Sequence, residues 1–281
     1  MPERVSVVIV SYNSADVLSD ALSSVPAEAE VIVVDNDSED GSTEIAAAFS
    51  ANVIKNEHNL GFGTACNQGA EIATKPYILF LNPDARLTPN SLATLLTEIS
   101  SDLAVAAVGP LLRGTHEIER PREATLLEPD RSPSFQTVPT EPTEVGFLSG
   151  AALLIRRDVF REIDGFDEKI FLYLEDDDLC YRLRQAGHRL RLIPAAVIEH
   201  ETNTAVRSSG RALRSRNYHT MMSLRYLATK HRVEIDFDRI RRKTWRRLLI
   251  SILTMDSERN HKSIGRLQGL DTWPFGRRQS D

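Results

Sequence analysis

The sequence predicts an α/β fold, in which a mostly parallel sheet is flanked by helices and followed by a C-terminal helical extension. Two observations carry this prediction. In the first half of the chain, β-branched and aromatic runs of strand length alternate with segments of helical spacing. These runs are almost continuously apolar, which is typical of strands in a parallel sheet that helices cover on both faces.

The expected elements follow one another in a regular order. Strands are expected at residues 5–10, 31–35 and 77–81, and residues 15–25, 42–49 and 64–73 have helical spacing. Residues 113–145 contain five prolines among charged and hydroxyl residues, which predicts an irregular excursion, often a substrate-covering segment. Residues 146–155 then return to strand character, 176–185 to a helix and 189–193 to a strand. From about residue 208 the pattern is helical.

Composition limits the class of protein. The chain has 281 residues, of which 41% are hydrophobic and 26% charged, as in an ordinary globular protein with one main domain and an appendage. Cys66 and Cys180 are too few for a disulfide framework and lack the spacing of a zinc site. No leader peptide and no run of about 20 apolar residues is apparent, so we expect a cytoplasmic protein, or a peripheral one on the inner face of the plasma membrane.

The formal charge of −6 is unevenly distributed. Residues 207–247 hold thirteen Lys or Arg residues against three acidic ones, and residues 240–253 are basic on one side and apolar on the other. No nucleic-acid-binding module is recognisable, so nucleic acid is not an expected partner. An anionic membrane surface, a pyrophosphate-bearing ligand or a solvated helical face packed on the main domain are the alternatives.

Polar clusters follow three of the expected strands. They are Ser11-Tyr12-Asn13, Asp35-Asn36-Asp37-Ser38 and Asn82-Pro83-Asp84. Each cluster alone could be an ordinary turn or helix cap. Because ligands bind beyond the carboxyl ends of parallel strands, three such clusters on one edge predict a binding site there.

Two further features suit a phosphate-bearing ligand. Asn59-Leu-Gly-Phe-Gly63, followed by Asn67, opens a helix with small residues, which lets backbone N–H groups approach phosphate. Asp84 could offer a hard oxygen ligand to Mg²⁺ or Mn²⁺, with phosphate and water completing the coordination. The alternative for Asp84 is a β-turn residue.

Carboxylates also gather at 175–178, directly before an apolar helical stripe. The dipole of that helix would help to keep a general base ionised, and Asp176 is the residue we select for this role. Asp178 and Arg182 are expected to form a structural i,i+4 pair. His200 ends an apolar strand at 195–200, where it is either a metal ligand or a structural histidine.

These motifs, in order across about residues 5–204, resemble those of glycosyltransferase family 2, and most closely its rhamnosyltransferase branch. They are Val8-Ile-Val-Ser-Tyr-Asn13, Val33-Val-Asp-Asn-Asp-Ser38, Asn59-Leu-Gly-Phe-Gly63 with Asn67, Leu79-Phe-Leu-Asn-Pro-Asp84, Gly165-Phe-Asp-Glu168 and Tyr173-Leu-Glu-Asp-Asp-Asp-Leu-Cys180 with Arg182. One departure is Asn82, which stands where the family's metal-binding triplet begins with Asp.

The resemblance implies a GT-A catalytic domain at 1–204, with a nucleotide-binding half at about 1–112 and an acceptor half at about 145–204, and a basic extension at 205–281. It implies inverting transfer with Asp176 as base, Asp84 and His200 as ligands of Mg²⁺ or Mn²⁺, and Gly150 and Glu175 at the acceptor. The implied donor-binding residues are Ser11, Tyr12, Asn13, Asp35, Asn36, Ser38, Asn59, Gly61, Phe62, Gly63, Asn67, Asn82 and Asp84.

For the rhamnosyl branch the implied donor is dTDP-L-rhamnose, and the acceptor is a lipid-linked or cell-envelope glycan such as N-acetylglucosaminyl-diphospho-polyprenol. The expected partners are therefore a nucleotide-sugar donor, that acceptor, an anionic membrane surface and, in a homodimer, a second copy of the chain. Transfer from another UDP- or dTDP-sugar and a non-catalytic sugar-nucleotide-binding subunit are the alternatives. A sugar-nucleotide pyrophosphorylase is disfavoured, because residues 11–14 lack a glycine-rich basic loop.

Overall fold

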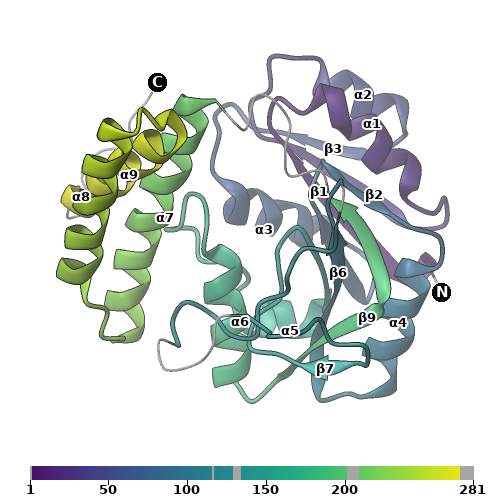
Figure 1. The fold of residues 1–281 in the computed structure, drawn as a ribbon. Coiled ribbons are helices and arrows are strands. Elements are labelled where there is room, and N and C mark those ends of the chain that lie inside the picture. The colour runs from purple at the N-terminus through teal and green to yellow at the C-terminus, as the bar shows by residue number, and fades with distance from the viewer. Residues whose placement is uncertain (1, 116, 129–133, 201–208, 273–281) are drawn as a thin grey trace. The chain divides into compact units, whose positions relative to one another are not determined.

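The computed structural model describes residues 2–115, 117–128, 134–200 and 209–272 (Figure 1). These residues form two compact units. The first comprises the described residues up to Phe171 and from Glu175 to 200, and the second comprises Leu172–Leu174 and 209–272. The expected boundary at 204/205 lies outside the described residues, and the assignment of catalysis to residues 1–204 stays a prediction.

The first unit begins with a parallel sheet. Strands β1 (Val5–Ser11), β2 (Glu30–Asp35), β3 (Asn52–Lys55) and β4 (Tyr77–Leu81) lie in the order β3-β2-β1-β4. A 3-10 turn at Pro2–Arg4 precedes β1. Helices α1 (Ala15–Ser24), α2 (Ser42–Ala48) and α3 (Phe62–Ile72) connect the four strands (Figure 1). The three strands and three helices expected in this half are confirmed, and β3 is an additional, partly exposed strand.

The second half of the sheet is mixed. It contains β5 (Ala85–Leu87), β6 (Val105–Arg113), β7 (Thr143–Glu144), β8 (Ala152–Arg156) and β9 (Arg189–His200). Strand β8 runs antiparallel to both β4 and β6, whereas β9 is parallel to β6. Helices α4 (Ser91–Ser101), α5 (Arg157–Glu162) and α6 (Glu175–Gln185) complete the unit. The α/β expectation is confirmed, with parallel pairing concentrated in the N-terminal half.

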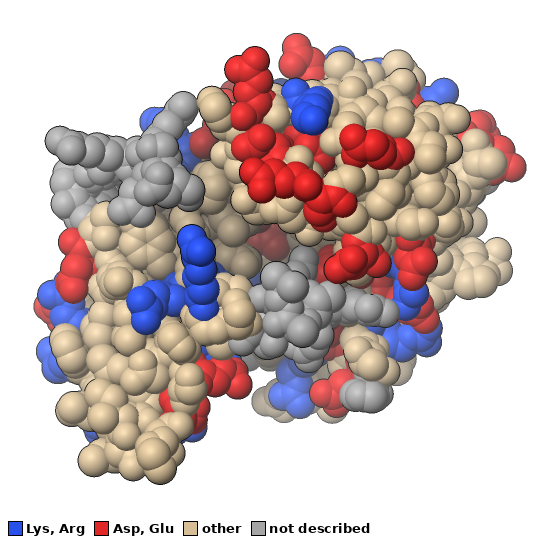
Figure 2. All heavy atoms as spheres, turned by 90° about the horizontal axis from the view of Figure 1, so that it is seen from above, with Lys and Arg blue, Asp and Glu red and all other residues tan. Residues whose placement is uncertain are grey.

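Helices cover both faces of this sheet, as the apolar strands predict. Val8 and Val10 project into a core cluster with α3 and α6, whereas Val7 and Ile9 project into another with α1 and α4. Figure 2 shows Asp and Glu side chains gathered on a face of this unit. The described part of the 113–145 excursion contains isolated bridges and the short β7 as its only regular pairing, which agrees with an irregular segment.

The second unit consists of three helices, α7 (Gly210–His231), α8 (Phe237–Leu253) and α9 (Ser257–Asp271). Helices α7 and α9 approach closely, because a Cβ at Gly265 would lie 2.2 Å from the carbonyl oxygen of Arg214. A Cβ at Gly269 would lie 2.5 Å from that of Tyr218. Across the described ranges, no helix combines the length and apolar character that crossing a membrane requires.

Candidate active site

The carboxyl ends of β1 and β2 bring together two unsatisfied polar groups. Ser11 and Asp35 are register partners, and Asn36 N donates to Ser11 O at 2.8 Å. Both side chains are fully buried. Asp35 Oδ1 accepts from Ser38 N at 3.0 Å, but Asp35 Oδ2 and Ser11 Oγ find no hydrogen-bond partner among the described residues. Buried polar atoms are rarely left unsatisfied, so this edge is suited to a ligand that forms hydrogen bonds.

The loops after β1 and β2 are joined to each other. Asn13 N donates to Ser38 Oγ at 2.9 Å, and Asn13 Oδ1 accepts from Glu39 N at 2.9 Å. Tyr12, between them, is 51% exposed, so its ring is available to a ligand. Asn13 and Ser38 therefore have structural contacts, and donor-binding roles for all three residues stay predictions.

A network of amides holds the loop before α3. Asn36 Nδ2 donates to Asn59 Oδ1 at 3.0 Å and to Gly61 O at 3.2 Å, and Leu60 N donates to Asn36 Oδ1 at 3.0 Å. Asn56 Nδ2 also donates to Asn36 Oδ1, at 3.0 Å. Asn36 and Asn59 thus hold the loop in shape. Their predicted role in binding the donor stays a prediction.

The glycines of this loop permit close packing. Gly61 has φ +88°, and a Cβ there would lie 2.2 Å from the carbonyl oxygen of Phe171, which accepts from Phe62 N at 3.1 Å. A Cβ at Gly63 would lie 3.0 Å from the Cβ of Phe166. Both glycines are therefore explained by packing within the first unit, and a phosphate contact stays a prediction.

Asn67 has a structural partner that the sequence did not predict. Its Nδ2 donates to Phe166 O at 2.9 Å, and its Oδ1 accepts from Phe166 N at 2.9 Å. Gly165, with φ +61°, is required beside it, because a Cβ there would lie 2.5 Å from Asn67 Oδ1. Asn67 thus fastens the 165–168 motif to α3, and its predicted contact with the donor is not tested by this pairing.

Asn82, Asp84 and His200 converge where β4 ends and β5 pairs with β9. Ala85 and His200 are register partners, and His200 Nε2 lies 3.5 Å from Asp84 Oδ1 and 3.5 Å from Asn82 Nδ2. His200 Nδ1 lies 3.2 Å from Glu119 Oε1. Asp84 and His200 are both buried. The structure therefore brings together the two residues predicted as metal ligands, and adds Glu119, which was not among the predicted residues.

His200 lies between two carboxylates, those of Asp84 and Glu119. Burial alone would lower the pKa of His200, but the Asp84 and Glu119 carboxylates outweigh it and raise that pKa to about 9. At neutral pH the imidazole is therefore protonated, and a cation held by Asp84 and His200 would displace that proton. Within the described ranges, no group of three or more His, Cys, Asp or Glu residues is placed to hold a metal. Asp84 with His200 could supply two ligands, and the rest would come from a diphosphate and water.

Asp176 lies in the first turn of α6. Its Oδ2 accepts from Gly150 N at 3.1 Å, and its Oδ1 accepts from Asp177 N at 2.9 Å. Burial raises the pKa of Asp176 to about 6, and repulsion from Asp177 adds to this, while the Gly150 N–H and Arg122 oppose it. A carboxylate with this pKa is ionised at neutral pH yet more basic than an ordinary Asp, as a general base requires.

Glu175 is buried beside the start of α3. Its Cβ lies 3.7 Å from the position of a Cβ on Gly63, and its Oε2 has no hydrogen-bond partner among the described residues. Burial and repulsion from Asp176 raise the pKa of Glu175 well above its usual range. A neutral Glu175 is consistent with these surroundings. Its acceptor-binding role, like that of Gly150, stays a prediction.

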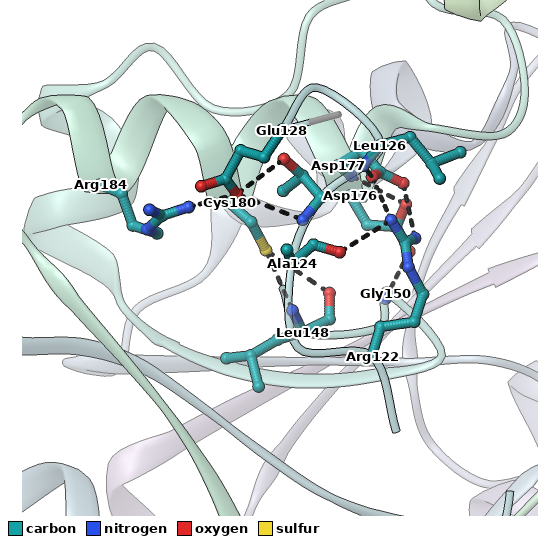
Figure 3. A network of polar contacts seen from close by, with 11 residues as sticks. Arg122, Ala124, Leu126, Glu128, Leu148, Gly150, Asp176, Asp177, Cys180 and Arg184 are labelled. Atoms are coloured by element: carbon teal, nitrogen blue, oxygen red, sulfur yellow. Dashed lines mark hydrogen bonds and ion pairs between the residues drawn. The ribbon is translucent and has the colours of Figure 1, made fainter. Parts of the chain in front are cut away.

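Arg122, from the irregular excursion, anchors the start of α6 (Figure 3). Its Nη1 donates to Asp177 Oδ2 at 2.9 Å and its Nη2 to Asp177 Oδ1 at 2.6 Å, while Leu126 N also donates to Asp177 Oδ1. The guanidinium stacks over the Phe147 ring, 3.7 Å from its centroid. No sequence signal marks Arg122, because a single arginine in a long irregular segment has no period or spacing that points to α6.

The chain is similar in sequence to known proteins. The profile described as Glycosyl transferase family 2 matches residues 6–164. The N-acetylglucosaminyl-diphospho-decaprenol L-rhamnosyltransferase of Mycobacterium tuberculosis (strain ATCC 25618 / H37Rv) is 31% identical over 267 residues, which covers 82% of this chain and 86% of that protein. Rhamnosyltransferase WbbL of Escherichia coli (strain K12) is 30% identical, with 84% of this chain and 97% of WbbL covered.

Solved structures share the fold. GalNAc-T7 with UDP, GalNAc and Mn²⁺ superposes with a TM-score of 0.62 at 21% identity, covering 78% of this chain and 47% of that one. At this identity the likeness concerns the fold alone, and it confirms the expected GT-A fold class.

Proposed function

This chain belongs to glycosyl transferase family 2, and we propose that it transfers L-rhamnose from dTDP-L-rhamnose to a lipid-linked glycan acceptor, with inversion at the sugar carbon. The activity of the chain as a glycosyltransferase follows from the family. The observation that carries the proposed mechanism is Asp176, a half-buried carboxylate held by Gly150 N at 3.1 Å, whose pKa is raised to about 6.

The donor would bind across the carboxyl ends of β1, β2 and β4. Ser11 Oγ and Asp35 Oδ2, both buried without a partner among the described residues, would form hydrogen bonds with the nucleotide base or ribose. The exposed ring of Tyr12 would stack on the base. The loop at 59–63, fixed by Asn36, would line the phosphates.

In the reaction, Asp176 would accept the proton of the acceptor hydroxyl as that oxygen forms a bond to the anomeric carbon. The bond from the anomeric carbon to the diphosphate oxygen breaks on the opposite side, and the nucleoside diphosphate leaves with the electron pair. This single displacement inverts the configuration. A general base of this kind contributes about 10²–10⁴-fold to the rate.

The negative charge of the departing diphosphate must be neutralised. A bound divalent cation supplies that electrostatic stabilisation. Asp84 and His200 are the residues that would hold it, since Asp84 Oδ1 and His200 Nε2 lie 3.5 Å apart. Asn82 lies at the same 3.5 Å distance from His200 and would orient the ring.

The relatives support the identity of the substrates. Both are named as rhamnosyltransferases, and the Mycobacterium tuberculosis protein is named for an N-acetylglucosaminyl-diphospho-decaprenol acceptor. Their names favour L-rhamnose as the sugar and a diphosphate-linked lipid carrying N-acetylglucosamine as the acceptor. We also propose that the protein attaches peripherally to the cytoplasmic face of the membrane that would hold such a lipid. A homodimer stays a prediction.

The donor can be identified by a thermal-shift screen. We expect dTDP-L-rhamnose to raise the melting temperature more than UDP- or GDP-sugars do, and Mn²⁺ to increase the shift, because a ligand that binds the folded state stabilises it. Transfer to N-acetylglucosaminyl-diphospho-lipid, followed by assignment of the product anomer by NMR, tests the sugar and the inversion. A larger shift and faster transfer with another nucleotide sugar would replace dTDP-L-rhamnose as the donor.

A non-catalytic sugar-nucleotide-binding subunit is the second candidate. It would bind the donor without consuming it. Slow donor hydrolysis that disappears in Asp176→Asn would exclude this candidate, and donor binding without any turnover would favour it.

A further inference from the structure

The C-terminal end of α8 exposes a group of large apolar side chains. This group, named here the apolar tip, consists of Leu249, Ile252, Leu253 and Met255, which are 58%, 57%, 84% and 91% exposed. Trp245, half exposed, lies one turn before Leu249 on the same side of the helix. Of the thirteen exposed large hydrophobic side chains in the described part of the chain, six lie between residues 245 and 255. Such a concentration marks an interaction surface.

The leucines of the apolar tip do not lie on the side of α8 that packs within its unit. The buried residues of the helix are Thr244, Leu248 and Ser251. With 100° between successive residues, these three lie on one side of the helix, whereas Leu249 and Leu253 lie on another. A helix that merely packs on the rest of the protein would bury its largest apolar residues. Here Thr244 and Ser251 are buried with Leu248, whereas Leu249 and Leu253 are exposed.

Basic side chains precede the apolar tip in α8. Helix α8 has six of them, Arg239, Arg241, Arg242, Lys243, Arg246 and Arg247, and Asp238 is its one carboxylate. Arg241 pairs with Asp271 at 3.2 Å. Arg242, Lys243, Arg246 and Arg247 make no ion pair with any residue that the structure describes. Residues 248–255 carry no charge, so positive charge and apolar surface follow each other along the helix.

This division matches the layers of a bilayer with anionic headgroups. Apolar side chains at the end of a helix can enter the boundary between headgroups and acyl chains, while arginines beside them reach the phosphates. Anionic lipids attract such basic residues, and the attraction weakens with salt. A second protein copy fits less well, because its α8 would bring the same unpaired positive charges together.

We propose that the apolar tip inserts into an anionic lipid bilayer and that Arg242 and Arg246 bind its headgroups. The inference rests on the proposed function, because a diphosphate-linked lipid acceptor lies in such a bilayer. It adds the surface by which the enzyme reaches that acceptor, and it does not depend on which sugar is transferred.

Vesicle flotation with the full chain tests this proposal. Binding to vesicles with 30% phosphatidylglycerol in phosphatidylcholine should exceed binding to phosphatidylcholine alone at least tenfold at 0.1 M NaCl. It should fall at least fivefold at 0.5 M NaCl. Leu249→Asn with Leu253→Asn, and separately Arg242→Gln with Arg246→Gln, should each weaken it at least tenfold.

Two controls are matched to these variants. Leu103→Asn replaces a leucine of the first unit that is 83% exposed, close to the 84% of Leu253. Arg259→Gln with Lys262→Gln removes the same charge from α9, where these residues pair with Asp256 and Glu258. Both controls should bind vesicles like the wild type. Vesicle binding that is unchanged in both α8 variants would overturn the proposal, as would equal loss in the controls.

Two further measurements separate this inference from its alternatives. The α8 variants should keep wild-type transfer to a water-soluble acceptor with a short lipid chain, and lose transfer to an acceptor embedded in vesicles. Loss of both would show damage to the enzyme and would overturn the docking role. Analytical ultracentrifugation should give the same oligomeric state for all variants, and a dimer dissolved by Leu249→Asn with Leu253→Asn would assign the surface to a second copy instead. Vesicle binding is measured without donor, so its result does not depend on whether the chain transfers a sugar.

Discussion

Arg122 and Asp177 form a bidentate ion pair directly beside Asp176, the proposed catalytic base. The two hydrogen bonds measure 2.9 and 2.6 Å, and the Asp177 side chain is almost fully buried. Paired bonds between a guanidinium and a carboxylate fix the orientation of both groups. The irregular segment is thereby attached to α6 at the residue after Asp176, and a positive charge is placed within the electrostatic reach of that carboxylate.

We expect Arg122→Met to change the pH dependence of transfer. Burial raises the pKa of Asp176, repulsion from Asp177 adds to this, and Arg122 opposes both. Glu175 and Cys180 are the other ionisable neighbours of Asp176 on α6. Without the guanidinium, the acidic limb of the kcat/KM profile should move upward by about 0.5–1 pH unit. Arg122→Lys, which keeps the charge, should shift it less.

The matched control for this prediction is Arg184→Met. Arg184 pairs with Glu128 at 2.6 Å and so holds the same irregular segment, but it is not among the groups that set the pKa of Asp176. Its profile should coincide with that of the wild type. Equal shifts in the Arg122 and Arg184 variants would show that the segment's attachment, and not the charge of Arg122, controls the profile.

Asp176→Asn should alter the pH dependence of stability. The folded pKa of Asp176 is about 6, above the ordinary value near 3.8, so the folded protein binds this proton more tightly than the unfolded chain does. The stability from this group is therefore complete below pH 4 and is lost as the pH rises through 6. The free energy of unfolding of the wild type, relative to Asp176→Asn, should fall by up to about 3 kcal/mol between pH 4 and 7.5. Urea denaturation at these pH values would measure it, and a flat difference would contradict the raised pKa.

Asp84→Asn should remove the contribution of Mn²⁺ to donor binding. An amide binds a divalent cation far more weakly than a carboxylate does. We expect dTDP alone to raise the melting temperature of this variant as in the wild type, and the further rise on adding Mn²⁺ to disappear. An undiminished Mn²⁺ effect would mean that the cation is held elsewhere.

The proximity of Asp84 and His200 was predictable for a reason that did not extend to the rest of the candidate site. Asp84 and His200 each follow an apolar run, so their arrival at one sheet edge could be read from the order of the strands. No sequence pattern predicts that Arg122 pairs with Asp177, which lies 55 residues away in the chain. Strand β6 was missed because Gly109 and Pro110 interrupt its apolar run, and the antiparallel direction of β8 depends on pairing with distant strands.

Gly61→Ala should strongly destabilise the first unit. Gly61 has φ +88°, and the added Cβ would lie 2.2 Å from the carbonyl oxygen of Phe171. We expect a loss of about 2–4 kcal/mol in the free energy of unfolding. Gly187→Ala is the control, because Gly187 has the same φ of +88° but nothing within 4 Å of the new Cβ, so the loss should be about 1 kcal/mol. Equal losses would mean that the contact with Phe171 is unimportant.

The central claim, that Asp176 removes the acceptor proton, is tested most directly by the transfer rate of Asp176→Asn at pH 7.5 with saturating dTDP-L-rhamnose. The variant should lose about 10³-fold or more in kcat. It should bind dTDP within threefold of the wild-type Kd, since the proposed donor contacts lie at the ends of β1, β2 and β4. Asp164→Asn, an exposed aspartate, is the control and should transfer normally. A folded, dTDP-binding Asp176→Asn protein that keeps near-normal transfer would contradict the account.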